Sequence, residues 1–182
     1  MRDTASETLA LPFEETASFS PTFDFKIFDS SSSSLRAAMH LFLDTNILLD
    51  IIEARPEFVE NSTQVLARAE EINARIFIAW HGLATIYYLI RRGRTEADTI
   101  REIDRILNWA EIAPVDSNTA IRARSLVFPD FEDAMQSACA ENCFADIIIT
   151  RNTKDFALSP VPALSPFEFL QRHSYPFDTQ KN

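Results

Sequence analysis

The chain has 182 residues, which fits one domain of about 100–200 residues, and 46% of them are hydrophobic, which excludes disorder throughout. It contains two glycines, too few for a glycine-rich phosphate-binding loop, and no run of about 18 apolar residues that would span a membrane. The formal net charge of −10 counts against a protein that binds nucleic acid only through its phosphates. It remains compatible with a nuclease whose acidic side chains hold metal ions.

The cysteine content gives no sign of a disulfide framework or a zinc site. Cys139 and Cys143 are the only two, they lie four residues apart on a predicted helix, and no second Cys/His pair accompanies them. We expect both to be buried and reduced, in a cytoplasmic protein.

Residues 1–38 differ in composition from the rest of the chain. They contain a five-serine run and no helical or alternating pattern, so we expect a disordered extension that the fold does not require. Met39 directly precedes the first strand, so a start codon assigned too far upstream is one explanation of this segment; its phenylalanines leave docking on a partner as another. Residues 175–182 are expected to form a short tail.

From residue 40 onward the pattern alternates between strands and helices. Short apolar runs predict strands at 40–45, 75–79, 112–115 and 145–150. Apolar residues at helical spacing predict helices at 47–54, 57–74, 81–92, 95–110, 118–127, 131–142 and 165–173. This order predicts an α/β fold in which a central, mostly parallel sheet is flanked by helices in three layers. Ligands of such sheets bind outside the carboxyl ends of the strands.

Acidic and polar side chains gather at those strand ends. Asp44 and Asn46 lie at the carboxyl end of the first strand, and Asp130 and Asp133 lie at a helix start. Thr150, Asn152 and Asp155 lie at and just beyond the end of the last strand. The motif at the first strand contains no lysine or arginine that would neutralise the Asp44 carboxylate. Mg²⁺ and Mn²⁺ bind preferentially to carboxylate oxygens. Acids converging on such an ion would activate water for attack on a phosphodiester.

Each of these residues also has a structural alternative. Asp44 or Asn46 would cap the next helix, and Asp130 would cap its own. Asp155 would close a turn with Asn152, and Asp50 would be structural or exposed.

The sequence resembles a PIN domain, the fold of VapC-type toxin ribonucleases. The resemblance rests on FLDTNILLDII at 42–52, LATIYYLIRR at 83–92, FEDAMQSACAENCFADIIITRNTKDF at 131–156 and SPFEFL at 165–170. It implies a PIN-like domain over residues 39–174 and three-layer α/β/α architecture.

The resemblance also implies an acid cluster that binds Mg²⁺ or Mn²⁺ and cleaves single-stranded RNA. Asp44 matches the first acid of the family, Asp133 the third and Asp155 the fourth, and each is expected to be a catalytic metal ligand. The second acid has no counterpart, because Thr85 stands at its position. His81, one helical turn earlier, either lines the same cleft or is a plain capping or surface residue.

Polar neighbours complete the implied site. Asn46, Thr150 and Asn152 match residues that line it, and Arg151 and Lys154 either contact phosphate or pair with Asp155.

Three functions remain open on the sequence alone. The leading one is a metal-dependent endoribonuclease, the toxin of a type II toxin–antitoxin pair, with an antitoxin partner and a homodimer interface on the apolar helices between 58 and 110. The second is a PIN domain that binds RNA or protein without cutting, because Thr85 leaves the acid set incomplete. The third is a phosphohydrolase of the haloacid-dehalogenase kind, which Asn46 disfavours because that family has a second Asp at this position.

Overall fold

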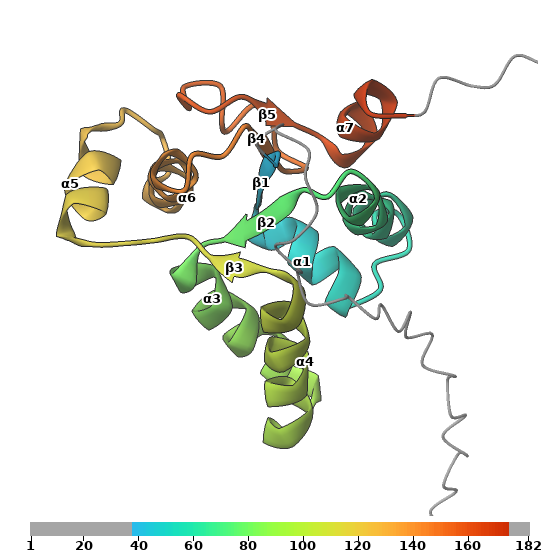
Figure 1. Ribbon diagram of the computed structural model, residues 1–182. Coiled ribbons are helices and arrows are strands. Elements are labelled where there is room, and N and C mark those ends of the chain that lie inside the picture. The colour runs from blue at the N-terminus through green and yellow to red at the C-terminus, as the bar shows by residue number, and fades with distance from the viewer. Residues whose placement is uncertain (1–37, 175–182) are drawn as a thin grey trace, which may run out of the picture.

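The computed structural model describes residues 38–174 (Figure 1). The expectations for the extension before Ala38 and for the tail after Ser174 therefore lie outside the described residues. The strands are β1 (His40–Leu43), β2 (Arg75–Ile78), β3 (Glu111–Ile112), β4 (Ile147–Ile149) and β5 (Ala163–Leu164). The helices are α1 (Thr45–Ile52), α2 (Val59–Glu71), α3 (Trp80–Ile90), the 3₁₀ turn η1 (Arg91–Gly93), α4 (Glu96–Trp109), α5 (Ser117–Ser125), α6 (Phe131–Asn142) and α7 (Pro166–Arg172).

The strands form one parallel sheet in the order β3-β2-β1-β4-β5. This confirms the predicted α/β class. The strand β5 was not predicted, because its two residues carry no alternating pattern. After β1 the chain builds outward through β2 and β3, and it then returns to β4 on the other side of β1. The strand order therefore reverses between β1 and β4, and this is where ligands of open parallel sheets bind.

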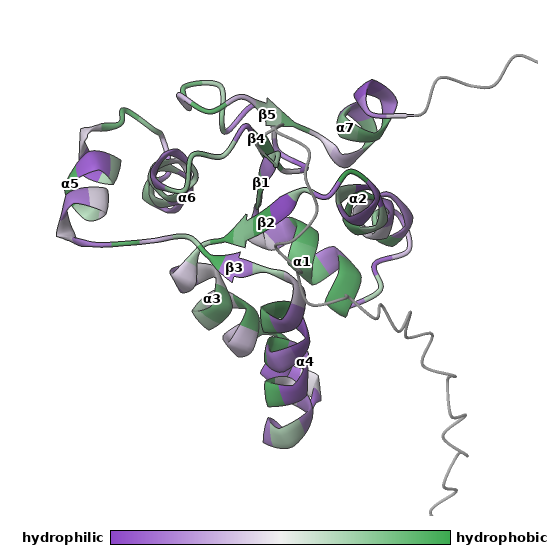
Figure 2. Ribbon diagram, in the orientation of Figure 1, coloured by the Kyte–Doolittle hydropathy of each residue, from purple (hydrophilic) through white to green (hydrophobic). Residues whose placement is uncertain are grey.

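The side chains of each strand alternate between two cores, one on each face of the sheet. Leu41 and Leu43 of β1 belong to the core that α1, α2, α3, α4 and α7 cover. Phe42, Phe77 and Ile148 point the other way and pack with α6 and the loop after β4. Figure 1 shows α5 and α6 on one side of the sheet and α1 to α4 on the other, and Figure 2 shows hydrophobic residues concentrated along α1. The predicted three layers are confirmed.

Helix caps explain where the site-bearing helices begin. Asp44 is the N-cap of α1, and Asn46, the alternative cap, is instead the second residue of that helix. Asp130 caps α6, as the sequence predicts, by accepting a hydrogen bond from the backbone N–H of Glu132 at 2.7 Å. Ser165 caps α7 in front of Pro166.

The helix α4 is less buried than its sequence pattern predicts. Ile106 is buried at 2% exposure, whereas Ile100 and Leu107, expected on the same face, are 44% and 45% exposed. The main packing partner of α4 is α3, so only a narrow stripe of α4 is covered. In the part of the chain that the structure describes, no helix is long and apolar enough to cross a membrane.

Gly82 lets α3 pack closely against α1 beside the site. A Cβ atom at this position would lie 2.8 Å from the Thr45 hydroxyl oxygen, closer than any ordinary contact. We expect Gly82→Ala to lower the free energy of unfolding by about 1–3 kcal/mol, the usual cost of overpacking, in urea unfolding. Gly93→Ala is the matched control, because an added Cβ there meets no atom within 4 Å. Equal stability of the two variants would contradict the close packing of α3 on α1.

Candidate metal centre

The carboxylate of Asp44 lies at the carboxyl end of β1, next to β4. The Asp44 backbone N–H donates to the carbonyl of Ile149 at 3.0 Å, which continues the sheet, and the side chain then caps α1. The residue is 5% exposed. Asp44 therefore caps α1 and also places its carboxylate at the strand end. From the sequence these two roles were alternatives.

Three neutral side chains hold the buried carboxylate of Asp44. Its Oδ2 accepts hydrogen bonds from Asn46 Nδ2 at 2.5 Å and from the Thr150 hydroxyl at 2.6 Å, and its Oδ1 accepts one from Gln136 Nε2 at 2.8 Å. Within residues 38–174, no lysine, arginine or histidine forms an ion pair with it. A buried carboxylate that has donors but no cation suits a site that receives a cation from outside.

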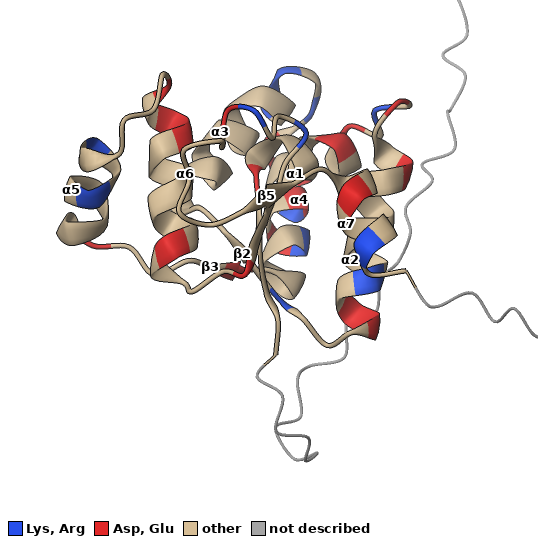
Figure 3. Cartoon of the chain, turned by 90° about the horizontal axis from the view of Figure 1, so that it is seen from above, with Lys and Arg blue, Asp and Glu red and all other residues tan. Residues whose placement is uncertain are grey.

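Asp133 lies in the first turn of α6, half-buried and surrounded by like charges. Burial raises its pKa to about 6, and the negative charges of Asp130, Asp44 and Asp155 add to this effect. The structure thus brings together acids that are up to 111 residues apart, from Asp44 to Asp155. Figure 3 shows acidic residues at both ends of α6.

Asp155 belongs to the loop after β4 and is exposed. The turn that contains it is closed by backbone atoms, since its N–H donates to the Asn152 carbonyl at 3.0 Å. Among the described residues its carboxylate forms no ion pair, so it is available to a ligand.

Two polar residues tie this loop to the Asp44 carboxylate. Thr150 is completely buried, and its hydroxyl accepts from Asn46 Nδ2 at 3.2 Å and from the Asn152 backbone N–H at 3.0 Å. Asn46 Oδ1 accepts from the backbone N–H of Arg151 at 3.3 Å. Asn46 and Thr150 therefore orient Asp44, while the Asn152 side chain is exposed.

The basic residues of the loop point in different directions. Arg151 forms an ion pair with the buried Asp50 at 3.2 Å, and its guanidinium lies 4.3 Å from the centre of the Phe58 ring. It does not pair with Asp155, one of the two roles expected for it. Lys154 is exposed, and in residues 38–174 it forms no ion pair.

The position of the missing acid lies on α3. Thr85 is exposed, and its hydroxyl donates to the backbone carbonyl of His81 at 3.4 Å. His81 is partly buried, which lowers its pKa, and its Nε2 lies 3.8 Å from Glu132 Oε1. His81 thus faces the acids of α6.

Sequence reasoning missed two residues of this cluster, Glu132 and Gln136. Gln136 Nε2 donates to both Asp44 Oδ1, at 2.8 Å, and Glu132 Oε1, at 3.0 Å. Burial raises the pKa of Glu132, and the charge of Asp44 raises it further. Their spacing of four residues puts them on one face of the predicted helix, next to Asp133, and this was the available signal.

The donor set fits a hard divalent cation, although its side chains are not yet arranged around one. Carboxylate oxygens are the preferred ligands of Mg²⁺ and Mn²⁺, and here they carry mutual repulsion that a cation would relieve. Among residues 38–174, no three His, Cys, Asp or Glu side chains stand in an arrangement that already holds a metal ion. Holding such an ion here would require rotation of the more exposed carboxylates, Asp133 and Asp155.

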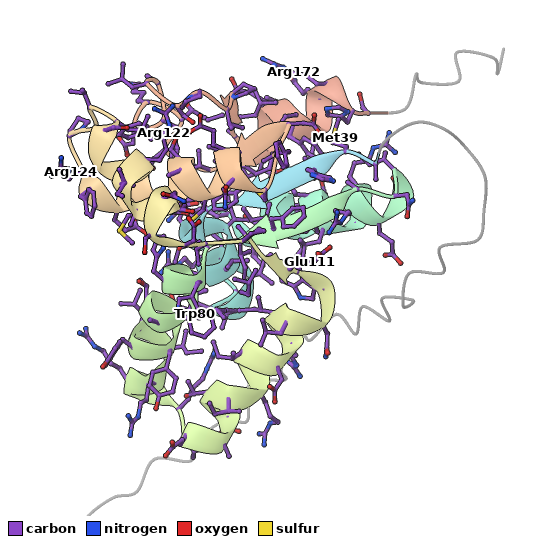
Figure 4. The ribbon with its side chains drawn as sticks, turned by 60° about the vertical axis from the view of Figure 1, so that its left-hand side comes forward. Met39, Trp80, Glu111, Arg122, Arg124 and Arg172 are labelled. Atoms are coloured by element: carbon purple, nitrogen blue, oxygen red, sulfur yellow. The ribbon has the colours of Figure 1, made fainter. Side chains whose placement is uncertain are left out.

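An apolar cavity of about 210 Å³ adjoins the acids. Its lining includes Trp80, His81, Phe131 and Met135. Trp80 is 63% exposed and Phe131 is 56% exposed. Figure 4 labels Trp80 at the start of α3, and Arg122 and Arg124 on α5.

Comparisons with known proteins agree with the fold. A sequence model for the PIN domain matches residues 40–154. The solved structure of VapBC2 from Rickettsia felis, bound to a promoter DNA fragment, is 21% identical, with a TM-score of 0.55 over 70% of this chain and 98% of that chain. VapBC-1 from nontypeable Haemophilus influenzae is 16% identical, with a TM-score of 0.57 over 71% of this chain and 99% of that one.

A toxin–antitoxin complex from Klebsiella pneumoniae is 24% identical, with a TM-score of 0.55 over 70% of this chain and 98% of that chain. Identities this low establish a shared fold and nothing more. A search of curated proteins found no match.

Proposed function

The chain belongs to the PIN domain family, and we propose that it is a metal-dependent endoribonuclease that cleaves single-stranded RNA. The observation that carries the proposal is the group of uncompensated carboxylates at the point where the strand order reverses. Asp44 is buried with neutral donors only, and Asp133 and Asp155 stand close enough for their charges to interact.

The chain's own residues would position the substrate and the ion. Asp44, Asp133 and Asp155 would hold Mg²⁺ or Mn²⁺, with Asn46 and Thr150 fixing the first of these carboxylates. A bound ion of this kind activates water and stabilises the negative charge that develops at a phosphodiester. Asn152 and Lys154 are exposed beside Asp155 and would contact the phosphates of the strand.

The apolar cavity that Trp80 and Phe131 line supports a single-stranded substrate. Bases that are not paired stack on exposed aromatic side chains, each with a gain of about 1–3 kcal/mol. Trp80 and Phe131 present such surfaces next to the acids of α6. Bases held in a duplex do not offer their faces in this way.

We place the protein in a toxin–antitoxin pair, as its toxin. Support comes from the printed descriptions of the similar structures, which are VapBC proteins and a toxin–antitoxin complex. The partner would be an antitoxin encoded next to this chain. A homodimer would use the exposed apolar residues of α3 and α4, which include Tyr88, Leu89, Ile100 and Leu107.

A binding module without cleavage is the second candidate function. It is favoured by Thr85, which replaces an acid with an exposed hydroxyl, and by the lack of a preformed metal-holding group in the described residues. In this case the apolar cavity would bind an RNA strand or a protein segment that the acids leave intact.

Incubation of the protein with three matched substrates separates these candidates. Single-stranded RNA, single-stranded DNA of the same sequence and duplex RNA are each incubated with Mn²⁺ and followed for products and for gel retardation. We expect products from single-stranded RNA and none from the duplex. Retardation of the RNA without products would support the binding module, and equal cleavage of DNA would contradict the assignment as a ribonuclease.

A further inference from the structure

Glu132 is joined to Asp44 by one buried amide group. Gln136 is 1% exposed, and its Nε2 donates one hydrogen to Asp44 Oδ1 at 2.8 Å and the other to Glu132 Oε1 at 3.0 Å. Only the NH₂ end of the amide suits this position, because its carbonyl oxygen would repel both carboxylates. The structure therefore holds an acid from α6 next to the acid at the end of β1.

Two buried polar atoms beside this bridge have no hydrogen-bond partner in the described part of the chain. One is the carbonyl oxygen Oε1 of the buried Gln136, and the other is His81 Nε2, which lies 3.8 Å from Glu132 Oε1. Buried polar atoms of this kind normally bind an ordered water or an ion. Mg²⁺ keeps several of its waters, and those waters are hydrogen-bond donors.

A purely structural role accounts for only part of this arrangement. An acid in the first turn of α6 interacts favourably with the helix dipole, and its spacing from Gln136 is that of an ordinary helical pair. Neither effect requires the same amide to hold Asp44 as well. Two carboxylates brought together in this way repel each other, and a bound cation relieves that repulsion.

We propose that Glu132 is the fourth carboxylate of the metal site and takes the place of the acid that is absent at Thr85. The inference rests on the proposed function only in requiring a divalent ion at Asp44. The Thr85 hydroxyl is bonded to the backbone of its own helix, whereas Glu132 Oε1 shares the Gln136 amide with Asp44 and Glu132 Oε2 accepts no hydrogen bond from residues 38–174.

Binding of Mn²⁺ to the full-length protein, counted by electron paramagnetic resonance, tests this role without an activity assay. Glu132→Gln keeps the shape of the side chain and removes its charge. We expect it to weaken Mn²⁺ binding at least about tenfold, the lower end of the losses that partners beyond the first ligands produce. Asp130→Asn is the matched control, because it removes a charge from the same helix end and retains a good cap. It should stay within about threefold of wild type, since the cap makes no contact with Asp44.

A swap of the acid between helices adds a rescue test. In the Glu132→Gln protein, Thr85→Glu should restore most of the lost Mn²⁺ affinity, because it adds a carboxylate one helical turn from His81, which lies 3.8 Å from Glu132. In the wild-type protein the same change should gain less than about threefold. From the missing acid alone, Thr85→Glu is expected to lower the metal concentration that the wild-type protein needs, so this arm also separates the two expectations.

Each outcome decides the role of Glu132. Wild-type affinity in Glu132→Gln would overturn it, and so would an equal loss in Asp130→Asn, which would reveal a general charge effect. If Asp44→Asn loses Mn²⁺ while Glu132→Gln does not, this inference fails and the proposed function stands. If the wild-type protein binds no Mn²⁺, both are wrong.

Discussion

Asp44→Asn is expected to remove RNA cleavage while the protein stays folded. The amide lacks the charge that holds a divalent ion, and we expect a loss of more than about 100-fold, the upper end of what partners beyond the ligands cause. Asn caps a helix as well as Asp does, so α1 should still begin at Thr45.

The free energy of unfolding of this variant should also fall, because hydrogen bonds to the carboxylate are lost. Asn46, Thr150 and Gln136 all donate to the Asp44 carboxylate, and an amide has only one oxygen to accept these bonds. Each buried donor that loses its acceptor costs about 1–3 kcal/mol, which circular dichroism during urea unfolding will measure. Thr153→Ala, in the neighbouring loop, is a suitable control for cleavage. Undiminished cleavage by Asp44→Asn would place the active site elsewhere.

Asp50→Ala should have the largest effect on folding. Asp50 is completely buried between Arg151 at 3.2 Å and Arg55 at 3.5 Å, and Ser62 donates to it at 3.3 Å. Burial raises its pKa, although the two positive charges oppose this. Truncation leaves the guanidinium groups without their buried partner, and such a loss destabilises by about 3–5 kcal/mol.

The neighbouring acid Glu53 provides the control for this change. Glu53 also pairs with Arg55, at 2.6 Å, but both side chains are about one-third exposed. An exposed pair contributes about 0–1 kcal/mol, so Glu53→Ala should unfold close to wild type in urea. If both variants lose the same stability, the buried pair with Arg151 does not anchor the loop after β4.

The alternation of strands and helices was sufficient to predict the layers and the parallel sheet. Strand ends were predicted less well, because the polar residues Asp44 and Thr45, expected at the end of the first strand, already belong to the cap and the first turn of α1. The spacing of apolar residues also overestimated the burial of Ile100 and Leu107, because the spacing does not show how much of α4 is covered by α3.

Contacts between distant residues mark the limit of sequence reasoning at the site. The partner of Asp50 is Arg151, 101 residues away, and no local pattern connects the two. Gln136 looked like an ordinary polar residue of α6, yet it binds Asp44 92 residues away. Motif positions indicated Asp44, Asp133 and Asp155 as candidates, but the side chains that orient Asp44 depend on which helix faces which strand end.

The most direct test of the proposed metal-dependent ribonuclease is a chelation and add-back assay with labelled single-stranded RNA. Wild-type protein and Asp133→Asn are incubated with Mn²⁺, with EDTA in excess, and with Mn²⁺ restored above the EDTA concentration. We predict that wild-type cleavage stops in EDTA and returns with Mn²⁺, and that Asp133→Asn cleaves far less than wild type with Mn²⁺ and not at all in EDTA. Cleavage that continues in EDTA, or equal cleavage by Asp133→Asn, would contradict a metal site at these carboxylates.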